Sequence, residues 1–269
     1  MTLTLRNSIL IGFLLVVTLF FLFFSAFLIY LVAGFPRSFL LNDLYQITES
    51  TKPIAELLIT CGAYILYSLV TGYVLKTYFR KTTSPEVFFF MLFTLSLSFN
   101  GLKCFQIFLI LNSLPSYYGV VLTRLDIFGT FFGLGCLFCA GIFPTGIRTQ
   151  KYGLFIGLIF LISVIIAASL PVDASTMDTS LSYAVGNKKE LYIVLYVLKL
   201  FSFINFFLAG YFKNNRDYYY LGLAILVLLA GTEAFRIFSS HLLEISGFIS
   251  LVFGTVFFSN RIHSLYMWR

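Results

Sequence analysis

The sequence predicts an all-α integral membrane protein, a polytopic bundle of about eight transmembrane helices. Of its 269 residues, 59% are hydrophobic and 11% are charged, whereas a soluble domain carries about 25% charged residues. Apolar runs of about 20 residues, the length that spans a bilayer, recur along the chain. No hydrophilic stretch between these runs is long enough to form a soluble domain. We therefore treat residues 1–269 as a single transmembrane domain.

The first crossing is expected over residues 9–33 without cleavage after it, because Leu31-Val32-Ala33 matches a signal-peptide cleavage site poorly. The last apolar run is short and has Glu244 near its start, so a re-entrant segment is the alternative to a full crossing there. The seven crossings after the first are expected at residues 54–74, 87–111, 117–143, 153–170, 191–212, 218–237 and 242–258.

The distribution of basic residues predicts the orientation. With eight crossings, one side of the membrane receives ten basic residues and two acids, Glu86 and Asp217. The other side's connections carry four basic residues and five acids. Because Lys and Arg are enriched in cytoplasmic loops, we expect both termini in the cytoplasm and the chain in the plasma (inner) membrane, with a composition typical of an AT-rich bacterium. The basic residues are too scattered along the sequence to form a continuous phosphate-binding surface. The net charge of +7 therefore does not predict a nucleic acid as partner.

The two long connections on the outer side predict a small external cap. Residues 34–52 and 171–190 hold mixed charges together with Ser and Thr. The cytoplasmic connections are short, and none of them can house a catalytic domain. Any chemistry is therefore expected within the membrane or at its outer face.

Charged residues inside the predicted helices are the candidate functional residues, because ionisable groups are costly in a membrane and face the bundle interior. At about 1.5 Å per residue, they all lie at mid-depth or in the outer half. Glu233 and Arg236 are three residues apart and are expected to pair, whereas Arg124 and Asp126 are two apart and reach different partners. We expect an outward-facing polar cavity closed below by Phe and Leu. The candidate ligand-binding residues are Lys103, Lys199, Glu233, Arg236, Arg124 and Asp126.

Each of these charges also has a structural interpretation. Lys103, Lys199 and Arg124 have long apolar stems that can carry the charge to the lipid headgroups. The Glu233–Arg236 pair can fix the register of its helix without binding a ligand. Three further residues open helices on the outer side and can reach the headgroups: Glu56, His241 and Glu244.

The small residues predict packing. All four cysteines lie in apolar runs, and although Cys136 and Cys139 have the CxxC spacing, we interpret them as packing residues. Gly129 and Gly133 form a small-xxx-small seam, which suits close packing either within the chain or in a homo-oligomer. We predict no cofactor and no metal site, because the chain has two histidines and one of them, His263, belongs to the predicted cytoplasmic tail.

These patterns favour a non-catalytic, receptor-like sensor or accessory subunit that binds a lipid-like or small charged ligand. Its expected partners are membrane lipids and a cytoplasmic or membrane protein. A secondary transporter is the first alternative, disfavoured because the helices lack internal proline and the inner halves lack a polar exit route. The second is an intramembrane lipid-modifying enzyme, for which Glu233 with Asp126 or Glu244 is the available acid–base set.

Overall fold

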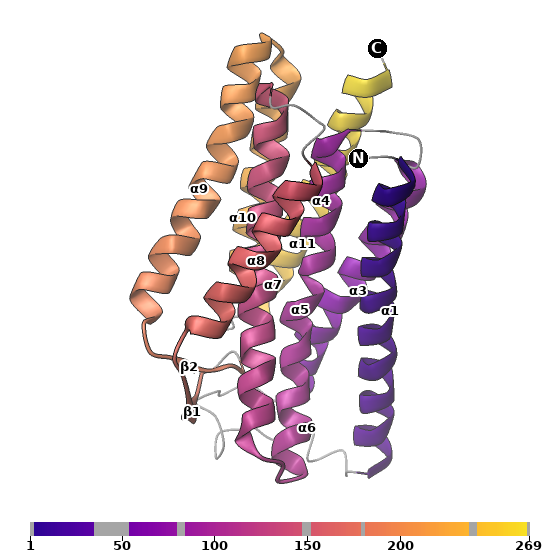
Figure 1. The fold of residues 1–269 in the computed structure, drawn as a ribbon. Coiled ribbons are helices and arrows are strands. Elements are labelled where there is room, and N and C mark those ends of the chain that lie inside the picture. The colour runs from indigo at the N-terminus through magenta and orange to yellow at the C-terminus, as the bar shows by residue number, and fades with distance from the viewer. Residues whose placement is uncertain are drawn as a thin grey trace.

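The computed structural model describes residues 3–34, 54–79, 84–146, 152–178, 181–236 and 241–267. Within these ranges eight helices are long and apolar enough to cross a membrane, which confirms the multi-pass helical bundle. Both ends of the chain lie at one end of the bundle, here called the termini end (Figure 1). The continuous helices are α1 (Leu3–Gly34), α3 (Ile54–Tyr78), α7 (Ser116–Ile142), α8 (Tyr152–Ser169), α9 (Lys188–Lys213), α10 (Arg216–Arg236) and α11 (His241–Met267).

The third crossing differs from the single helix predicted over residues 87–111. It consists of four consecutive pieces: α4 (Pro85–Ser96), α5 (Ser98–Gly101), the 3₁₀ turn η2 (Leu102–Cys104) and α6 (Phe105–Leu111). The crossing itself is present as predicted, because Pro85–Leu111 is long and apolar enough to span a membrane, but a 3₁₀ turn interrupts its α-helix.

The eighth crossing is one uninterrupted helix. α11 spans 27 residues, packs along α10 and is long and apolar enough for a full crossing, which favours eight crossings over the re-entrant alternative. Glycines bring the two backbones together: a Cβ at Gly231 would lie 2.7 Å from the Leu251 amide nitrogen. α1 and α11 also extend beyond the predicted limits, because the polar residues that flank their apolar runs continue the helix.

A small β-hairpin lies at the opposite end of the bundle, here called the hairpin end (Figure 1). β1 (Val172–Met177) pairs antiparallel with β2 (Tyr183–Val185), and the hairpin contacts α7. The predicted cap is thus present for the connection between α8 and α9. The other predicted cap segment, residues 34–52, lies almost wholly outside the described residues.

α7 is the central helix of the bundle, in contact with α4, α8 and α9 (Figure 1). α1 and α3 pack beside the broken crossing, whereas α10 and α11 pack together beside α9. Helix α4 is buried on all sides, while α8 and α9 present large apolar side chains on their outer surfaces, such as Ile165 and Ile193. Such surfaces suit contact with lipid.

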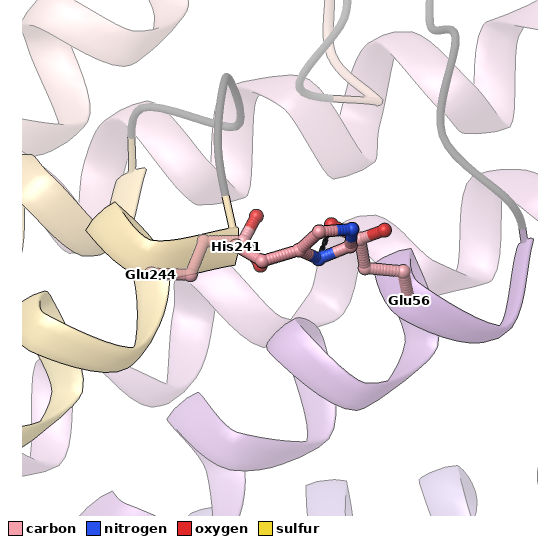
Figure 2. A group of neighbouring side chains, drawn as sticks. All are labelled: Glu56, His241 and Glu244. Atoms are coloured by element: carbon pink, nitrogen blue, oxygen red, sulfur yellow. Dashed lines mark ion pairs between the residues drawn. The ribbon is translucent and has the colours of Figure 1, made fainter.

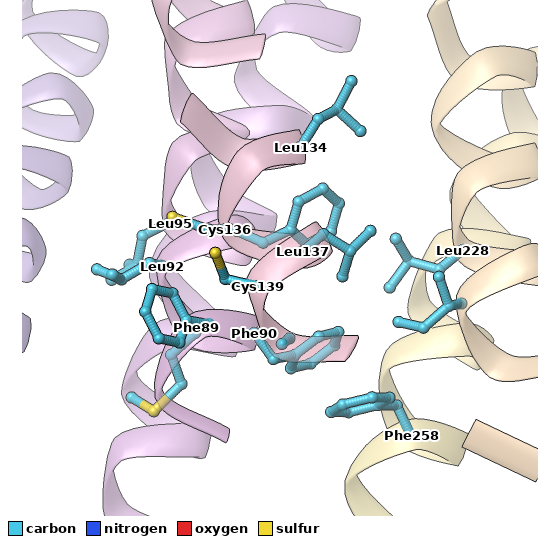
Figure 3. Packing of buried hydrophobic residues seen from close by; sticks show 14 of the residues in the cluster. Phe89, Phe90, Leu92, Leu95, Leu134, Cys136, Leu137, Cys139, Leu228 and Phe258 are labelled. Atoms are coloured by element: carbon cyan, nitrogen blue, oxygen red, sulfur yellow. The ribbon is translucent and has the colours of Figure 1, made fainter. Parts of the chain in front are cut away.

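The termini half of the bundle is a dense apolar layer. Phe89 and Phe90 of α4, Leu137 of α7, Leu228 of α10 and Phe258 of α11 are all buried there (Figure 3). Phe90 stacks on Phe258 with 3.9 Å between ring centroids. These side chains form the expected floor of Phe and Leu, but two charged residues, Glu86 and Arg6, are also buried in this half of the bundle.

Candidate functional site

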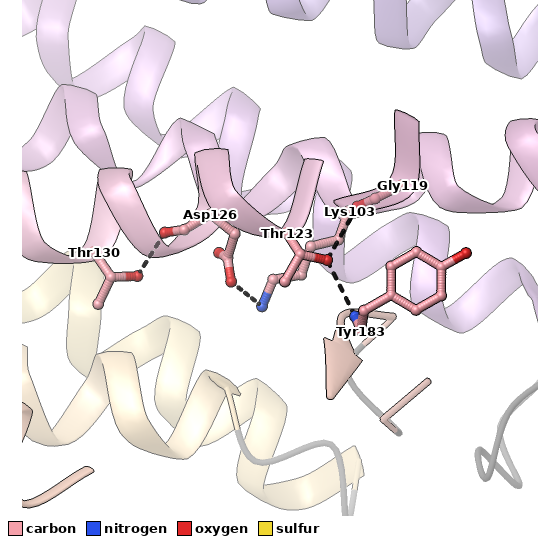
Figure 4. A network of polar contacts seen from close by, with 6 residues as sticks. All are labelled: Lys103, Gly119, Thr123, Asp126, Thr130 and Tyr183. Atoms are coloured by element: carbon pink, nitrogen blue, oxygen red, sulfur yellow. Dashed lines mark hydrogen bonds and ion pairs between the residues drawn. The ribbon is translucent and has the colours of Figure 1, made fainter. Parts of the chain in front are cut away.

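A polar stripe follows one face of α7. Thr123, Asp126 and Thr130 are spaced three and four residues apart, which places them on the same side of a helix. The Thr130 hydroxyl donates to the Asp126 carbonyl oxygen at 3.0 Å. Under the hairpin, the Tyr183 N–H donates to the Thr123 hydroxyl oxygen at 3.1 Å (Figure 4). The stripe therefore starts at the hairpin and leads to the middle of the bundle.

Lys103 and Asp126 form a buried ion pair beside this stripe. The Lys103 Nζ lies 3.0 Å from Asp126 Oδ2, and the two side chains are only 4% and 6% exposed (Figure 4). The other carboxylate oxygen, Asp126 Oδ1, is buried and accepts no hydrogen bond from the described residues. The pair joins the 3₁₀ turn of the broken crossing to α7. Both side chains are buried against each other, so the Lys103 charge is neutralised inside the bundle and does not extend to the protein surface.

The break in the third crossing has a physical cause in its small polar residues. The hydroxyls of Ser96 and Ser98 donate to the carbonyl oxygens of Phe93 and Leu95 at 2.7 and 2.8 Å. Such bonds compete with the helical ladder and bend helices. The Asn100 N–H then bonds the Leu97 carbonyl three residues back, at 3.1 Å. The signal that could have predicted the break is the Ser-Leu-Ser-Phe-Asn-Gly run at residues 96–101.

A small cavity lies where this break faces α7, α9 and α10. Its volume is about 40 Å³, which is room for a few water molecules but not for a lipid headgroup. One side of the lining is apolar, with Tyr64, Phe93 and Leu134. The polar side chains that line it are Ser96, Asn100, Thr130, Lys199, Thr232 and Glu233.

Lys199 of α9 and Glu233 of α10 form an ion pair in the cavity wall. Their side chains are 12% and 23% exposed, so this pair is less enclosed than Lys103–Asp126. The Lys199 ammonium also lies 5.3 Å from the centroid of the Tyr196 ring. The cavity therefore offers one cation, one anion and several hydroxyl and amide groups to a small guest.

No family model and no curated protein matches this sequence.

The structure brings four of the six candidate residues into two ion pairs and separates the others. Glu233 pairs with Lys199 across two helices, a contact that the sequence analysis did not predict, while its expected pairing with Arg236 stays a prediction. The Arg236 side chain lies outside the described residues. Arg124 is exposed on α7 and does not line the cavity, since its position two residues before Asp126 turns it to another face.

The glycine seam faces the same chain. A Cβ at Gly129 would overlap the Phe99 side chain, and one at Gly133 would overlap Ser96. Both contacts are with the broken crossing, so the two glycines allow α7 to approach it closely. Because these contacts are within one chain, the seam gives no support for a homo-oligomer, which stays a prediction.

Two polar groups were not among the predicted site residues. At the termini end, the Tyr266 hydroxyl donates to Glu86 Oε2 at 2.6 Å, which joins α11 to the start of α4. At the hairpin end, three side chains from α3 and α11 gather, namely Glu56, His241 and Glu244. Sequence spacing could show that His241 and Glu244 share a helix face, but nothing in it indicated that α3 begins beside α11.

Proposed function

We propose that this protein is a non-catalytic, receptor-like membrane component that binds a small charged ligand in the cavity between Lys199 and Glu233. The observation that supports this most is the ion pair itself: opposite charges face one small space at mid-bundle, where uncompensated charge is costly. A ligand that is an ion or a small zwitterion can replace either partner of the pair. The cavity volume favours such a ligand over the lipid-like one considered from the sequence.

The polar stripe of α7 supports entry from the hairpin end. Thr123, Asp126 and Thr130 connect the hairpin to the cavity, whereas the termini half is filled by aromatic and aliphatic side chains. Thr123 and Asp126 are only 2% and 4% exposed, so a ligand that enters along this stripe requires the helices to separate at the hairpin end. One-sided access suits a sensor, because a sensor responds to the bound ligand and does not release that ligand on the other side of the membrane.

The orientation is part of the same proposal. From the excess of Lys and Arg in the connections at the termini end, we infer that this end faces the cytoplasm of the plasma (inner) membrane and that the hairpin lies outside. The short basic connections at the termini end then offer a surface to a cytoplasmic or membrane protein partner. This orientation is tested by fusing Met1 and, separately, Arg269 to a reporter enzyme that is active only outside the cytoplasm. We expect both fusions to be inactive, and activity of either one contradicts the orientation.

The experiment that tests ligand binding is purification from native membranes in mild detergent, followed by mass spectrometry of every retained small molecule and protein. We expect a ligand at equimolar amount in the wild type and its loss in Lys199→Met and Glu233→Gln. Arg124→Gln is the matched control, because Arg124 is a charged α7 residue outside the cavity. Equal retention in all four proteins contradicts the proposal, and so does a wild type that retains nothing.

A secondary transporter is the second candidate, and the broken crossing is the observation that favours it. Discontinuous helices at mid-membrane form the binding sites of many transporters, and this break lines the cavity with Ser96 and Asn100. Reconstituted vesicles distinguish the two candidates. Flux of protons or small ions that Lys199→Met abolishes identifies a transporter, whereas ligand retention without flux identifies a receptor.

A further inference from the structure

Three metal-ligating side chains meet at the hairpin end, away from the cavity. Glu56 lies in the first turn of α3, and His241 and Glu244 lie in the first turn of α11 (Figure 2). Their ligand atoms all lie within 4.8 Å of one another, and no other group of three such residues occurs among the described parts of the chain. His241 Nδ1 is 3.1 Å from Glu56 Oε1.

The distances suit one metal ion after small side-chain rotations. Nitrogen and oxygen ligands bind transition metals at about 2.0–2.2 Å, so two ligands of one ion are at most ~4.4 Å apart. The three side chains are already close to this limit. His241 and Glu244 are three residues apart, a spacing that presents both ligands on the same helix face.

Burial also fits a binding site with an open side. Glu244 is 7% exposed and the Glu56 side chain 12%, so packing holds both carboxylates in place. The His241 side chain is 75% exposed, which leaves the third ligand at the surface where a cation arrives. Two carboxylates and a neutral imidazole carry two negative charges, which match a dication. The imidazole favours a transition metal over magnesium or calcium.

We propose that Glu56, His241 and Glu244 bind a divalent transition-metal ion that joins the hairpin ends of α3 and α11. α11 packs against α10, which carries Glu233, and α3 carries Tyr64 of the cavity wall. Metal binding therefore fixes two walls of the cavity relative to each other from outside the membrane. The metal site stands independently of any ligand in the cavity.

Calorimetric titration of the purified full-length protein with Zn²⁺ tests the proposal. We expect equimolar, saturable binding and a higher thermal unfolding temperature with Zn²⁺. His241→Ala is expected to weaken binding at least about 10-fold, and Glu244→Gln to do the same. Because His241 is exposed, its replacement leaves the fold intact, which the unfolding temperature without metal checks.

His263→Ala is the matched control. His263 is the other histidine of the chain and lies on α11 near Tyr78, far along the helix from His241. Zn²⁺ binding by His263→Ala at wild-type affinity supports the site. Absence of saturable binding in the wild type, or equal weakening by His241→Ala and His263→Ala, overturns it. Binding of Mg²⁺ or Ca²⁺ without Zn²⁺ also overturns it.

Discussion

The two ion pairs that the described residues form inside the bundle differ in what surrounds them. Lys103–Asp126 is enclosed on all sides and joins a 3₁₀ turn to the central helix, while Lys199–Glu233 is partly exposed and borders a cavity. A fully enclosed pair can do little besides hold two elements together. A pair with a free side can exchange a partner for a ligand. The comparison therefore favours a structural role for the first pair and agrees with the binding role proposed for the second.

The largest expected effect on stability comes from replacing one charged partner in each ion pair. Asp126→Leu leaves the Lys103 ammonium buried without a counter-charge, so we expect the free energy of unfolding to fall by about 3–5 kcal/mol. Glu233→Leu leaves Lys199 beside the cavity and the Tyr196 ring, so we expect a smaller fall of about 1–2 kcal/mol. Unfolding of the purified variants in detergent measures both values.

The double variant Lys103→Met/Asp126→Leu is the control for a structural pair. It removes both charges and keeps similar volumes, so its stability should return to within about 1 kcal/mol of the wild type. Equal losses from Asp126→Leu and Glu233→Leu would break the distinction between the two pairs.

Close packing beside the enclosed pair gives the next largest effect. Gly129→Ala would push the new methyl group into Phe99 of the broken crossing, so we expect a loss of about 1–3 kcal/mol in the free energy of unfolding. Gly157→Ala is the matched control, because nothing lies within 4 Å of a Cβ there, and alanine favours the helix by up to about 1 kcal/mol. If Gly129→Ala instead keeps its stability and dissociates a dimer, the seam is an interface between copies.

Loss of the hydrogen bond between the hairpin and the polar stripe of α7 should have a smaller effect on stability than the substitutions above. Thr123→Val removes the oxygen that accepts the Tyr183 N–H, so the hairpin should lose about 0.5–1.5 kcal/mol of its attachment to α7. Hydrogen exchange at the Tyr183 amide should then be faster by up to about 10-fold. Thr130→Val, one end of the same stripe, should leave that amide unchanged, and an equal change in both variants would refute a local role for Thr123.

The smallest effect concerns pH at the exposed hairpin. The Ser175 N–H and hydroxyl both donate to Asp173 Oδ1, at 2.9 and 2.7 Å, and they lower the pKa of Asp173 below its ordinary value. The charged carboxylate therefore supports this turn above the ordinary carboxyl pKa, and the support is lost as the pH falls through the lowered pKa. Exchange of the Ser175 amide should accelerate in acid in the wild type but stay independent of pH, after correction for intrinsic rates, in Asp173→Ala.

The sequence predicted the number of helices and most of their positions, because hydrophobic length alone determines a membrane crossing. It also identified Lys103, Asp126, Lys199 and Glu233, since intramembrane charges are few and conspicuous. It could not predict which of them pair, because pairing depends on which helices become neighbours. The partner of Glu233 on α9, Lys199, was therefore not predicted. The break at Ser96–Gly101 was missed for another reason: serine and glycine bend a helix only when a neighbour approaches closely, as α3 does at Gly101.

Thiol labelling tests the central claim, that a polar route from the outside reaches the cavity and ends at the apolar layer. Thr130→Cys lies at the cavity and Leu137→Cys lies two turns deeper in the packed layer, and the four native cysteines are buried and supply the background. We predict that Ag⁺, a thiol-reactive cation small enough for a cavity of about 40 Å³, modifies Thr130→Cys from the outside and leaves Leu137→Cys unmodified from either side. Labelling of Leu137→Cys, or protection of Thr130→Cys from the outside, would contradict the account.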